Sequence, residues 1–363
     1  MSVLNERLRA AFAPPRYLAL PLSGVDLSTS GVKAVRLEQT AHGLILAGNN
    51  EVRLDSGAFT DGEIVDRAAV VSALRQASHA AGIATTNAAL SESKSYLFET
   101  IVEGNDASAW RIAVEQHLDE LIPLPPQETA FDIVRAGETK EGNSVVSGIG
   151  YAHRVVDETL SAFDEAHIGV RALEGETFAL GRSLLPMGDT STSLIIDVGK
   201  TTTKIAVVSG QIPRFATTIQ IGGHALTLAV QKHFGVTEME ARKVKAERGI
   251  VFAPGNEDYL AAMLSTVSAI RDEIATRLHY WQDKAAEGTA HEPVTKAILA
   301  GGNASVRGLA EYLESALKIP VAVGDVFTNL ASRNHWIPTL DYTESLAYAT
   351  AIGLALRDGR KHV

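Results

Sequence analysis

The sequence predicts an α/β protein made of two duplicated domains around a cleft, with a small α+β subdomain inserted into the first domain. Three observations lead to this prediction. A strand-turn-strand segment occurs twice, and the block between its two copies has strands and a helix of its own. A Gly-Gly turn lies between a strand and a helix near the end of the chain. The repeat carries the most weight, because an internal repeat can set the whole fold.

The repeated segment is seen when "GVDLSTSGVKAVRL" (24–37) is placed under "IIDVGKTTTKIAVV" (195–208). This alignment pairs Asp26 with Asp197 and Lys33 with Lys204, and each turn carries small hydroxyl residues. Such turns offer backbone amides and hydroxyls to oxyanions, while an aspartate at the strand end can reach a hydrated metal ion. Ordinary hairpins with Ser/Thr turns are the alternative. The presence of two copies favours a duplicated phosphate clamp.

A P-loop is the competing interpretation of the second copy, since Gly199-Lys200-Thr201 looks like the end of one. That motif needs a glycine five positions earlier, where this chain has Leu194, and a helix immediately afterwards. The residues from Ile205 to Val208 instead form a β-branched run, which predicts a second strand. The segment is therefore predicted to be strand, turn and strand.

Composition limits the classes of function. The chain has 363 residues, enough for two domains, and 21% of them are charged, with a formal net charge of −10. This balance disfavours a general nucleic-acid binder. Cysteine is absent, which excludes disulfides and thiolate metal sites. No apolar stretch is long enough to span a bilayer, and "MSVLNERLRAAFAPP" lacks the apolar centre of a signal peptide, so a cytoplasmic location is expected.

The elements of the first half follow from the spacing of apolar residues. A strand is expected near 44–52 after the first hairpin, and Ile64, Val70, Val71 and Leu74 recur at helical spacing, which predicts a helix from 63 to 81. Alternation predicts strands within 88–102, and Asp106 is expected to begin a helix that "IPLPP" ends. Strands near 128–134 and 144–151 and a helix from 155 to 166 follow. A continuation of the first sheet is the alternative to an inserted subdomain.

The second half begins with the second hairpin. A helix is expected to end near Gly235, and Thr237 with Glu240 forms a capping box that begins another. A long helix from 257 to about 284 carries one apolar stripe, in which Trp281 is expected to be core. The closing segment, 296–323, predicts a strand, a glycine turn, a helix and a strand. The helix is expected to begin just beyond Asn303 and to present its amides there.

With these residues in view, the chain resembles the actin-like ATPase superfamily, to which actin and bacterial FtsA belong. The resemblance implies two ribonuclease H-like domains that enclose ATP and Mg²⁺, with Asp26 and Asp197 near the metal. It implies that the cofactor-binding residues come from the two hairpins, the Gly-Gly turns and the helix after the capping box. They are Ser28, Thr29, Ser30, Lys33, Gly199, Thr201, Thr202, Thr203, Gly222, Gly223, Glu240, Lys245, Gly301, Gly302 and Asn303.

Within that superfamily the chain is most similar to the PilM family of type IV pilus assembly. "EQHLDELIPLPPQETAFDIV" (115–134), "IQIGGHALTLAVQKHFGVTEMEA" (219–241) and "ESLAYATAIGLALR" (344–357) carry this resemblance. It implies a cytoplasmic protein that reaches the inner membrane through partners. The partners implied are the cytoplasmic N-terminal tail of a PilN-like inner-membrane protein and pilus assembly ATPases, with no nucleic acid. Departures from the family pattern occur at Ser28, Arg242 and Asn303.

The predicted domains follow the same resemblance. They are a first actin-like domain (17–87 with 152–190), an inserted partner-binding subdomain (88–151), a second actin-like domain (191–222 with 297–363) and its helical subdomain (223–296). The residues predicted to line the partner groove are Tyr96, Phe98, Trp110, Leu121, Ile122 and Leu124, with core packing as the alternative for each of them.

Catalysis is expected to be slow at most, because no residue of the sequence is an unambiguous partner for an attacking water. The candidate is Glu176, for which a carboxylate at a helix start is the alternative. For Lys200 and Lys204, a solvated position is the alternative to a contact with phosphate. An FtsA-like cell-division protein and a sugar-kinase-like phosphotransferase remain the alternative functions. The first needs a C-terminal amphipathic helix, where this chain has "RDGRKHV", and the second needs a base for a substrate hydroxyl.

Overall fold

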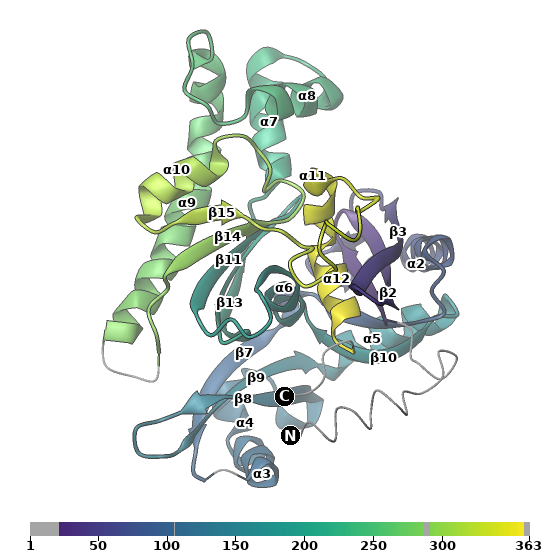
Figure 1. Cartoon of the computed structure of the whole chain (residues 1–363), viewed down its shortest axis with the longest axis vertical. Helices are drawn as coiled ribbons and strands as arrows, with labels where there is room; N and C mark the ends of the chain where they lie inside the picture. Colours follow the sequence, from purple (N-terminus) through teal and green to yellow (C-terminus); the bar gives the residue numbers. More distant parts are fainter. Residues whose placement is uncertain (1–21, 105, 287–290, 359–363) are drawn as a thin grey trace.

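The computed structural model describes residues 22–104, 106–286 and 291–358 (Figure 1). The first residues of the predicted first domain, 17–21, lie outside the described residues. Two five-stranded sheets form the body of the protein. The first has the order β10 (Gly169–Gly175), β6 (Thr85–Leu90), β1 (Leu22–Ser28), β2 (Gly31–Thr40) and β3 (Gly43–Arg53). The second has the order β13 (Ile212–Ile219), β12 (Thr203–Ser209), β11 (Thr192–Val198), β14 (Lys296–Ala300) and β15 (Val321–Val323).

The two sheets have the same topology. In each, the repeated segment forms an antiparallel hairpin, β1–β2 or β11–β12, and a third strand, β3 or β13, continues the antiparallel part. On the other side of β1 and β11 lie two parallel strands, β6 with β10 and β14 with β15. This confirms the predicted duplicated α/β fold.

The hairpin register repeats as well. Asp26 lies directly opposite Lys33, and Asp197 lies directly opposite Lys204. Residues opposite each other in an antiparallel pair share one face of the sheet, and a slip of one residue would turn them to the other face. The shared register therefore brings an aspartate and a lysine to the same place in both domains.

A third sheet carries the block between the two repeats. Its order is β7 (Tyr96–Val102), β9 (Ser144–Ala152) and β8 (Thr129–Glu138), and α3 (Ala107–Gln116) and α4 (Leu118–Leu121) cover one face. The expected start of the insertion at residue 88 falls inside β6, a strand of the first sheet that lies beside β1. The separate sheet begins at Tyr96, after the short 3₁₀ helix η2 (Glu92–Lys94). We refer to residues 96–152 as the inserted sheet.

The remaining helices surround the two large sheets. They are α2 (Arg67–Ala81), α5 (His153–Glu165), α6 (Glu176–Leu184), α7 (Gly223–Phe234), α8 (Glu238–Arg248), α9 (Glu257–Ala286), α10 (Leu309–Leu317), α11 (Tyr342–Ser345) and α12 (Ala349–Leu356). In Figure 1, α6 and α12 lie between the two sheets. They cross so closely that a Cβ added to Gly353 would lie 1.9 Å from the carbonyl oxygen of Ala179. None of the helices in the described ranges is both long enough and apolar enough to cross a membrane.

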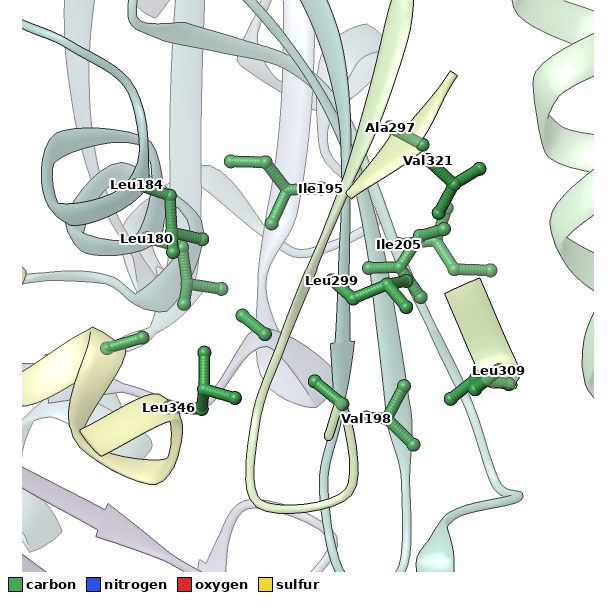
Figure 2. Packing of buried hydrophobic residues seen from close by; sticks show 14 of the residues in the cluster. Leu180, Leu184, Ile195, Val198, Ile205, Ala297, Leu299, Leu309, Val321 and Leu346 are labelled. Carbon is green, nitrogen blue, oxygen red and sulfur yellow. The ribbon is translucent and has the colours of Figure 1, made fainter. Parts of the chain in front are cut away.

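The largest core surrounds the second sheet. Every residue of β11 is buried, as expected for a central strand with both faces covered. Figure 2 shows Leu180 and Leu184 of α6 on one side of these strands and Leu309 of α10 on the other. The predicted stripe of α9 packs into the same core, where Trp281 is 2% exposed and its indole N–H donates to the carbonyl of Glu292.

Two expected helix starts need correction, and two strands must be added. The helix predicted from residue 63 begins at Arg67, because the Asp66 side chain accepts the amide of Ala69, while β5 (Glu63–Ile64) pairs with β4 (Phe59–Thr60). The helix expected just beyond Asn303 begins only at Leu309, after a series of turns. Strands β10 and β13 were not expected at all, although each forms an edge of its sheet.

Candidate functional site

A cleft of about 320 Å³ lies between the two hairpin turns. Its lining combines residues of both domains. From the hairpins they are Asp26, Ser28, Thr29, Ser30, Lys33, Asp197, Gly199, Lys200, Thr202 and Lys204, and from other elements Glu176, Gly223, Arg242, Lys245, Gly301, Gly302 and Asn303. Most of the residues predicted to bind cofactor or metal therefore line one cavity. Its volume is at the lower end of the range for small-molecule sites.

The first turn holds its lysine by hydroxyl groups. Lys33 Nζ donates to Ser30 Oγ at 2.7 Å and to Ser28 Oγ at 3.5 Å, and Glu51 Oε1 lies 3.6 Å away. The lysine side chain is only 5% exposed, although it lines the cleft. Its shortest contact is with a neutral hydroxyl, which a phosphate oxygen could replace, so Lys33 is suited to donate to phosphate.

The second turn is tied to its surroundings by backbone bonds. Gly199 N–H donates to the carbonyl of Thr202, and the first amides of α7, those of Gly223 and His224, donate to the carbonyls of Gly199 and Lys200. The two turns also meet directly, because Thr29 Oγ1 and Thr201 Oγ1 lie 2.9 Å apart in a hydrogen bond. The two domains therefore contact each other at the mouth of the cleft.

Lys204 forms the main ionic contact across the domain boundary. Its Nζ lies 2.9 Å from Glu176 Oε1, in the first domain, and 3.2 Å from Asp197 Oδ2, in the second. Burial alone would lower the pKa of Lys204, but Glu176, Asp197 and Asp26 outweigh burial and raise this pKa. Lys204 is thus a permanent cation of the cleft. The sequence contained the signal, because the repeat pairs Lys204 with Lys33.

Asp26 is a buried carboxylate whose charged form is disfavoured by its surroundings. Burial first, and then the charge of Glu176, raise its pKa from 3.8 to about 6, against the opposing effect of Lys33 and Lys204. Its Oδ1 is buried and has no hydrogen-bond partner among the described residues. A buried carboxylate oxygen without a donor is a suitable ligand for a hydrated cation, and Asp197 lies across the same cleft.

Asp26 and Asp197 are therefore suited to bind a metal ion together. Magnesium is a hard cation that carboxylate oxygens bind well. Within residues 22–104, 106–286 and 291–358, no three His, Cys, Asp or Glu side chains are grouped as a metal-binding set. The two aspartates fit an ion that takes its remaining ligands from water and phosphate. Bound there, it would supply positive charge to the phosphates.

The far end of the cleft is built around the Gly-Gly turn. Gly301 has φ +88°, and an added Cβ would lie 2.3 Å from Asp197 Oδ1, so only glycine fits. Lys245 Nζ donates to the carbonyl of Gly223 at 3.1 Å and to Asn303 Oδ1 at 2.8 Å. Burial, with Arg242 as the second cause, lowers the pKa of Lys245 to about 8. Asn303 also donates to the carbonyl of Gly199, which joins this turn to the second hairpin.

Some predicted site residues lie away from the cleft. Glu240 accepts from the amide and the hydroxyl of Thr237 in the capping box and is exposed, so its carboxylate caps α8. Thr203 Oγ1 donates to the carbonyl of Ile221 behind the turn, and Gly222 packs against the backbone of the turn. Arg242 lines the cleft instead, and its guanidinium donates to Glu238. Of the two residues predicted from α8, Lys245 therefore lines the cleft and Glu240 does not, while Arg242, two positions after Glu240, lines it as well.

The predicted partner residues belong to the small core of the inserted sheet. Phe98 and Ile122 are 7% and 1% exposed, and each fills the space left by a glycine of β9. Tyr96, Trp110, Leu121 and Leu124 are partly buried and pack against the same core. Phe98 and Ile122 therefore have a packing role, while the other four present part of their surface to solvent.

Two like sheets with paired phosphate-type hairpins around one cleft define an actin-like α/β protein. Solved structures of this class share the fold. EutJ, an ethanolamine utilization protein from Carboxydothermus hydrogenoformans, has TM-score 0.52 and 16% identity over 93% of this chain and 90% of that chain. MreB5 of Spiroplasma citri, solved bound to AMPPNP, has TM-score 0.52 and 14% identity over 92% of this chain and 94% of that chain.

The particular family follows from two further matches. A PilM-PilN type IV pilus biogenesis complex has TM-score 0.76 and 19% identity over 93% of this chain and 98% of that chain. The family model described as type IV pilus assembly protein PilM matches residues 24–359. The chain belongs to the PilM family of type IV pilus assembly proteins, as the sequence predicted.

Proposed function

We propose that this protein binds ATP with Mg²⁺ between its two actin-like domains and uses the bound nucleotide to control a partner at the inner membrane. The observation that supports this most is the pair of hairpins with matched Asp–Lys register that line one cleft. The solved MreB5 relative holds AMPPNP, a nucleotide of the same class. Lys33 is the proposed donor to the phosphates, and Asp26 and Asp197 are the proposed outer ligands of the metal.

Slow hydrolysis at most is part of the proposal. Glu176 is the candidate to position a water, but both of its carboxylate oxygens are engaged, by Lys204 Nζ and by the amide of Glu92. A water-positioning carboxylate needs a free acceptor near the γ-phosphate. Closure of the domains around ATP is therefore the functional event, and turnover resets it.

The proposed partner is the N-terminal tail of a PilN-like inner-membrane protein. The solved complex that resembles this chain pairs PilM with PilN. We propose that the tail lies beside the inserted sheet and contacts the exposed parts of Tyr96, Leu121 and Leu124, through which the protein would be held at the cytoplasmic face of the membrane. The domain boundaries are proposed with it, with the start of the insertion moved from residue 88 to Tyr96: 17–95 with 153–190, the inserted sheet (96–152), 191–222 with 297–363, and 223–296.

Calorimetry tests the nucleotide part. Lys33→Ala and Asp197→Ala should each weaken ATP·Mg²⁺ binding at least about tenfold, the loss of one charge-assisted contact. Lys232→Ala, which removes an exposed lysine of α7, is the control and should change the affinity less than about twofold. Unchanged affinity in both cleft variants would show that ATP binds elsewhere.

Peptide binding tests the partner part. A synthetic N-terminal PilN tail should bind the wild-type protein, and Leu124→Glu should weaken binding at least about tenfold by placing a charge in an apolar contact. Ile112→Glu is the matched control, because Ile112 is 57% exposed on α3 of the same subdomain. Equal binding by both variants would place the tail on another surface.

A further inference from the structure

Glu92 and Glu176 each accept a hydrogen bond from the chain segment that carries the other residue. The amide of Glu92 donates to Glu176 Oε2 at 2.8 Å, and the carboxylate of Glu92 accepts from the amide and hydroxyl of Thr177 at 3.2 and 3.0 Å. The two residues are 84 positions apart, and they are 4% and 1% exposed. The contact is therefore a buried, reciprocal clamp between two distant parts of the chain.

One side of this clamp is the root of the inserted sheet. Glu92 begins η2 (Glu92–Lys94), the link that leaves β6 of the first sheet and enters β7. Ser95 Oγ donates to Glu92 Oε1 at 2.6 Å, which fixes the last residue before β7 to the same carboxylate. The position of Glu92 thus sets where the inserted sheet leaves the first domain.

The other side of the clamp is the nucleotide cleft. Glu176 is the first residue of α6, and Thr177 is the second, so the Glu92 carboxylate acts as a cap for this helix from outside the segment. The second oxygen of Glu176 accepts from Lys204, which also contacts Asp197 of the proposed metal site. A continuous series of buried polar contacts therefore runs from Asp197 to Glu92.

We propose that Glu92 is a positioning residue that transmits the state of the nucleotide cleft to the inserted sheet. The inference rests on the proposed function and assigns a regulatory contact to its site. Lys204 and Asp197 would be drawn away from their present contacts, with Glu176 and with each other, if they bound a metal–phosphate group between the hairpins. Either change would alter the hydrogen bond between the Glu176 carboxylate and the Glu92 amide. Through η2 it would then alter the position of β7 relative to the first domain.

The burial of Glu92 agrees with this role. Burial is the largest cause that raises its pKa, and the nearby Glu176 charge adds to it, while Ser95 and Thr177 act in the opposite direction by hydrogen bonding. A packing role alone would be met by an apolar side chain at lower desolvation cost. The Glu92 carboxylate instead accepts hydrogen bonds from Thr177 at the N-terminus of α6 and from Ser95 in the turn before β7. These contacts are specific to one arrangement of α6 and η2.

The test measures coupling, since coupling is a thermodynamic quantity separate from either affinity. The affinity of full-length protein for the synthetic PilN tail is measured with and without ATP·Mg²⁺. In wild-type protein the nucleotide should change tail affinity about fivefold or more, and the tail should change ATP affinity by the same factor. In Glu92→Ala this factor should fall below about twofold, while ATP affinity alone changes less than about threefold.

Controls separate coupling from damage. Glu92→Gln retains one acceptor oxygen for Thr177 and should restore part of the coupling. Glu128→Ala removes an exposed carboxylate of the inserted subdomain and should leave the coupling intact. If Glu92→Ala does not fold, hydrogen exchange in the wild-type protein decides instead, and ATP·Mg²⁺ should change the exchange rate of the Glu92 amide about fivefold or more.

The outcomes are distinct for the two proposals. Failure of ATP or of the tail to bind wild-type protein overturns the proposed function. Binding of both without mutual effect, full coupling in Glu92→Ala, or an unchanged Glu92 exchange rate overturns the role of Glu92 and leaves the proposed function standing.

Discussion

Asp26 should make the protein less stable as the pH rises, and Asp26→Asn should remove this effect. The pKa of Asp26 is raised from 3.8 to about 6 by burial and by Glu176. Because the folded pKa lies above the unfolded one, the unfolded chain loses this proton first as pH rises. Stability contributed by the group is therefore highest below about pH 4 and falls until about pH 6. The difference between a pKa of 3.8 and a pKa of about 6 corresponds to about 3 kcal/mol.

The assay is urea unfolding of the wild type and Asp26→Asn between pH 4 and pH 7, without nucleotide. Asparagine is neutral throughout, so the free energy of unfolding of the variant, relative to wild type, should rise by about 3 kcal/mol across this range. Asp55→Asn, at an exposed carboxylate of the same domain, is the control and should show no such trend. A pH-independent difference for Asp26→Asn would refute the argument that Asp26 carries a desolvated charge.

Metal binding connects the same residue to function. A divalent cation restores favourable electrostatics to ionised Asp26, so ATP·Mg²⁺ should stabilise wild-type protein more than Asp26→Asn, and the difference should shrink below pH 6 as the proton competes with the metal. Equal stabilisation of both proteins at pH 7 would remove Asp26 from the metal site.

Two further substitutions test the cleft. Lys204→Met should lower the free energy of unfolding by about 3–5 kcal/mol, because it leaves Glu176 and Asp197 buried without their cation. The control, Lys296→Met, removes a more exposed ion pair with Asp189 and should cost about 1 kcal/mol or less in the same urea assay. Equal losses would contradict the interdomain role of Lys204. Gly301→Ala should abolish ATP binding measured by calorimetry, because the added Cβ would collide with Asp197. The control is Gly57→Ala, at a position with φ +96° and no atom within 4 Å of the added Cβ. It should cost only about 1–2 kcal/mol of stability and leave the ATP affinity unchanged.

The parts of the fold that could be predicted are those encoded by local pattern or by repetition. The Asp–Lys register of the hairpins is visible because it occurs twice, and the α9 stripe is visible because its period is helical. The start of α2 was misplaced because Ile64 continues the helical period, although the Asp66 cap decides the boundary. Edge strands β10 and β13 are short, and the sheet neighbours that define them come from distant parts of the chain.

The site shows the same division. Residues on the hairpins could be assigned to the cleft from the sequence, whereas the raised pKa of Asp26 depends on Glu176, 150 positions away in the chain, and on burial that only the folded state creates. The Glu92–Thr177 contact has no local signature for the same reason. Glu240 was assigned by its place on a helix, but its side chain serves the local cap, and Arg242 reaches the cleft.

The lysines of the two duplicated hairpins have different partners. Lys33 is held by hydroxyls of its own turn, with the nearest carboxylate oxygen, that of Glu51, 3.6 Å away. Lys204, at the equivalent position, is held at 2.9 Å by a carboxylate of the other domain. An incoming phosphate can therefore recruit Lys33 without breaking a close ion pair, whereas recruiting Lys204 must weaken the tie between the domains. The same tie leads through Glu176 to the root of the inserted sheet, so under the proposed function the first hairpin would hold the nucleotide and the second would report that it is held.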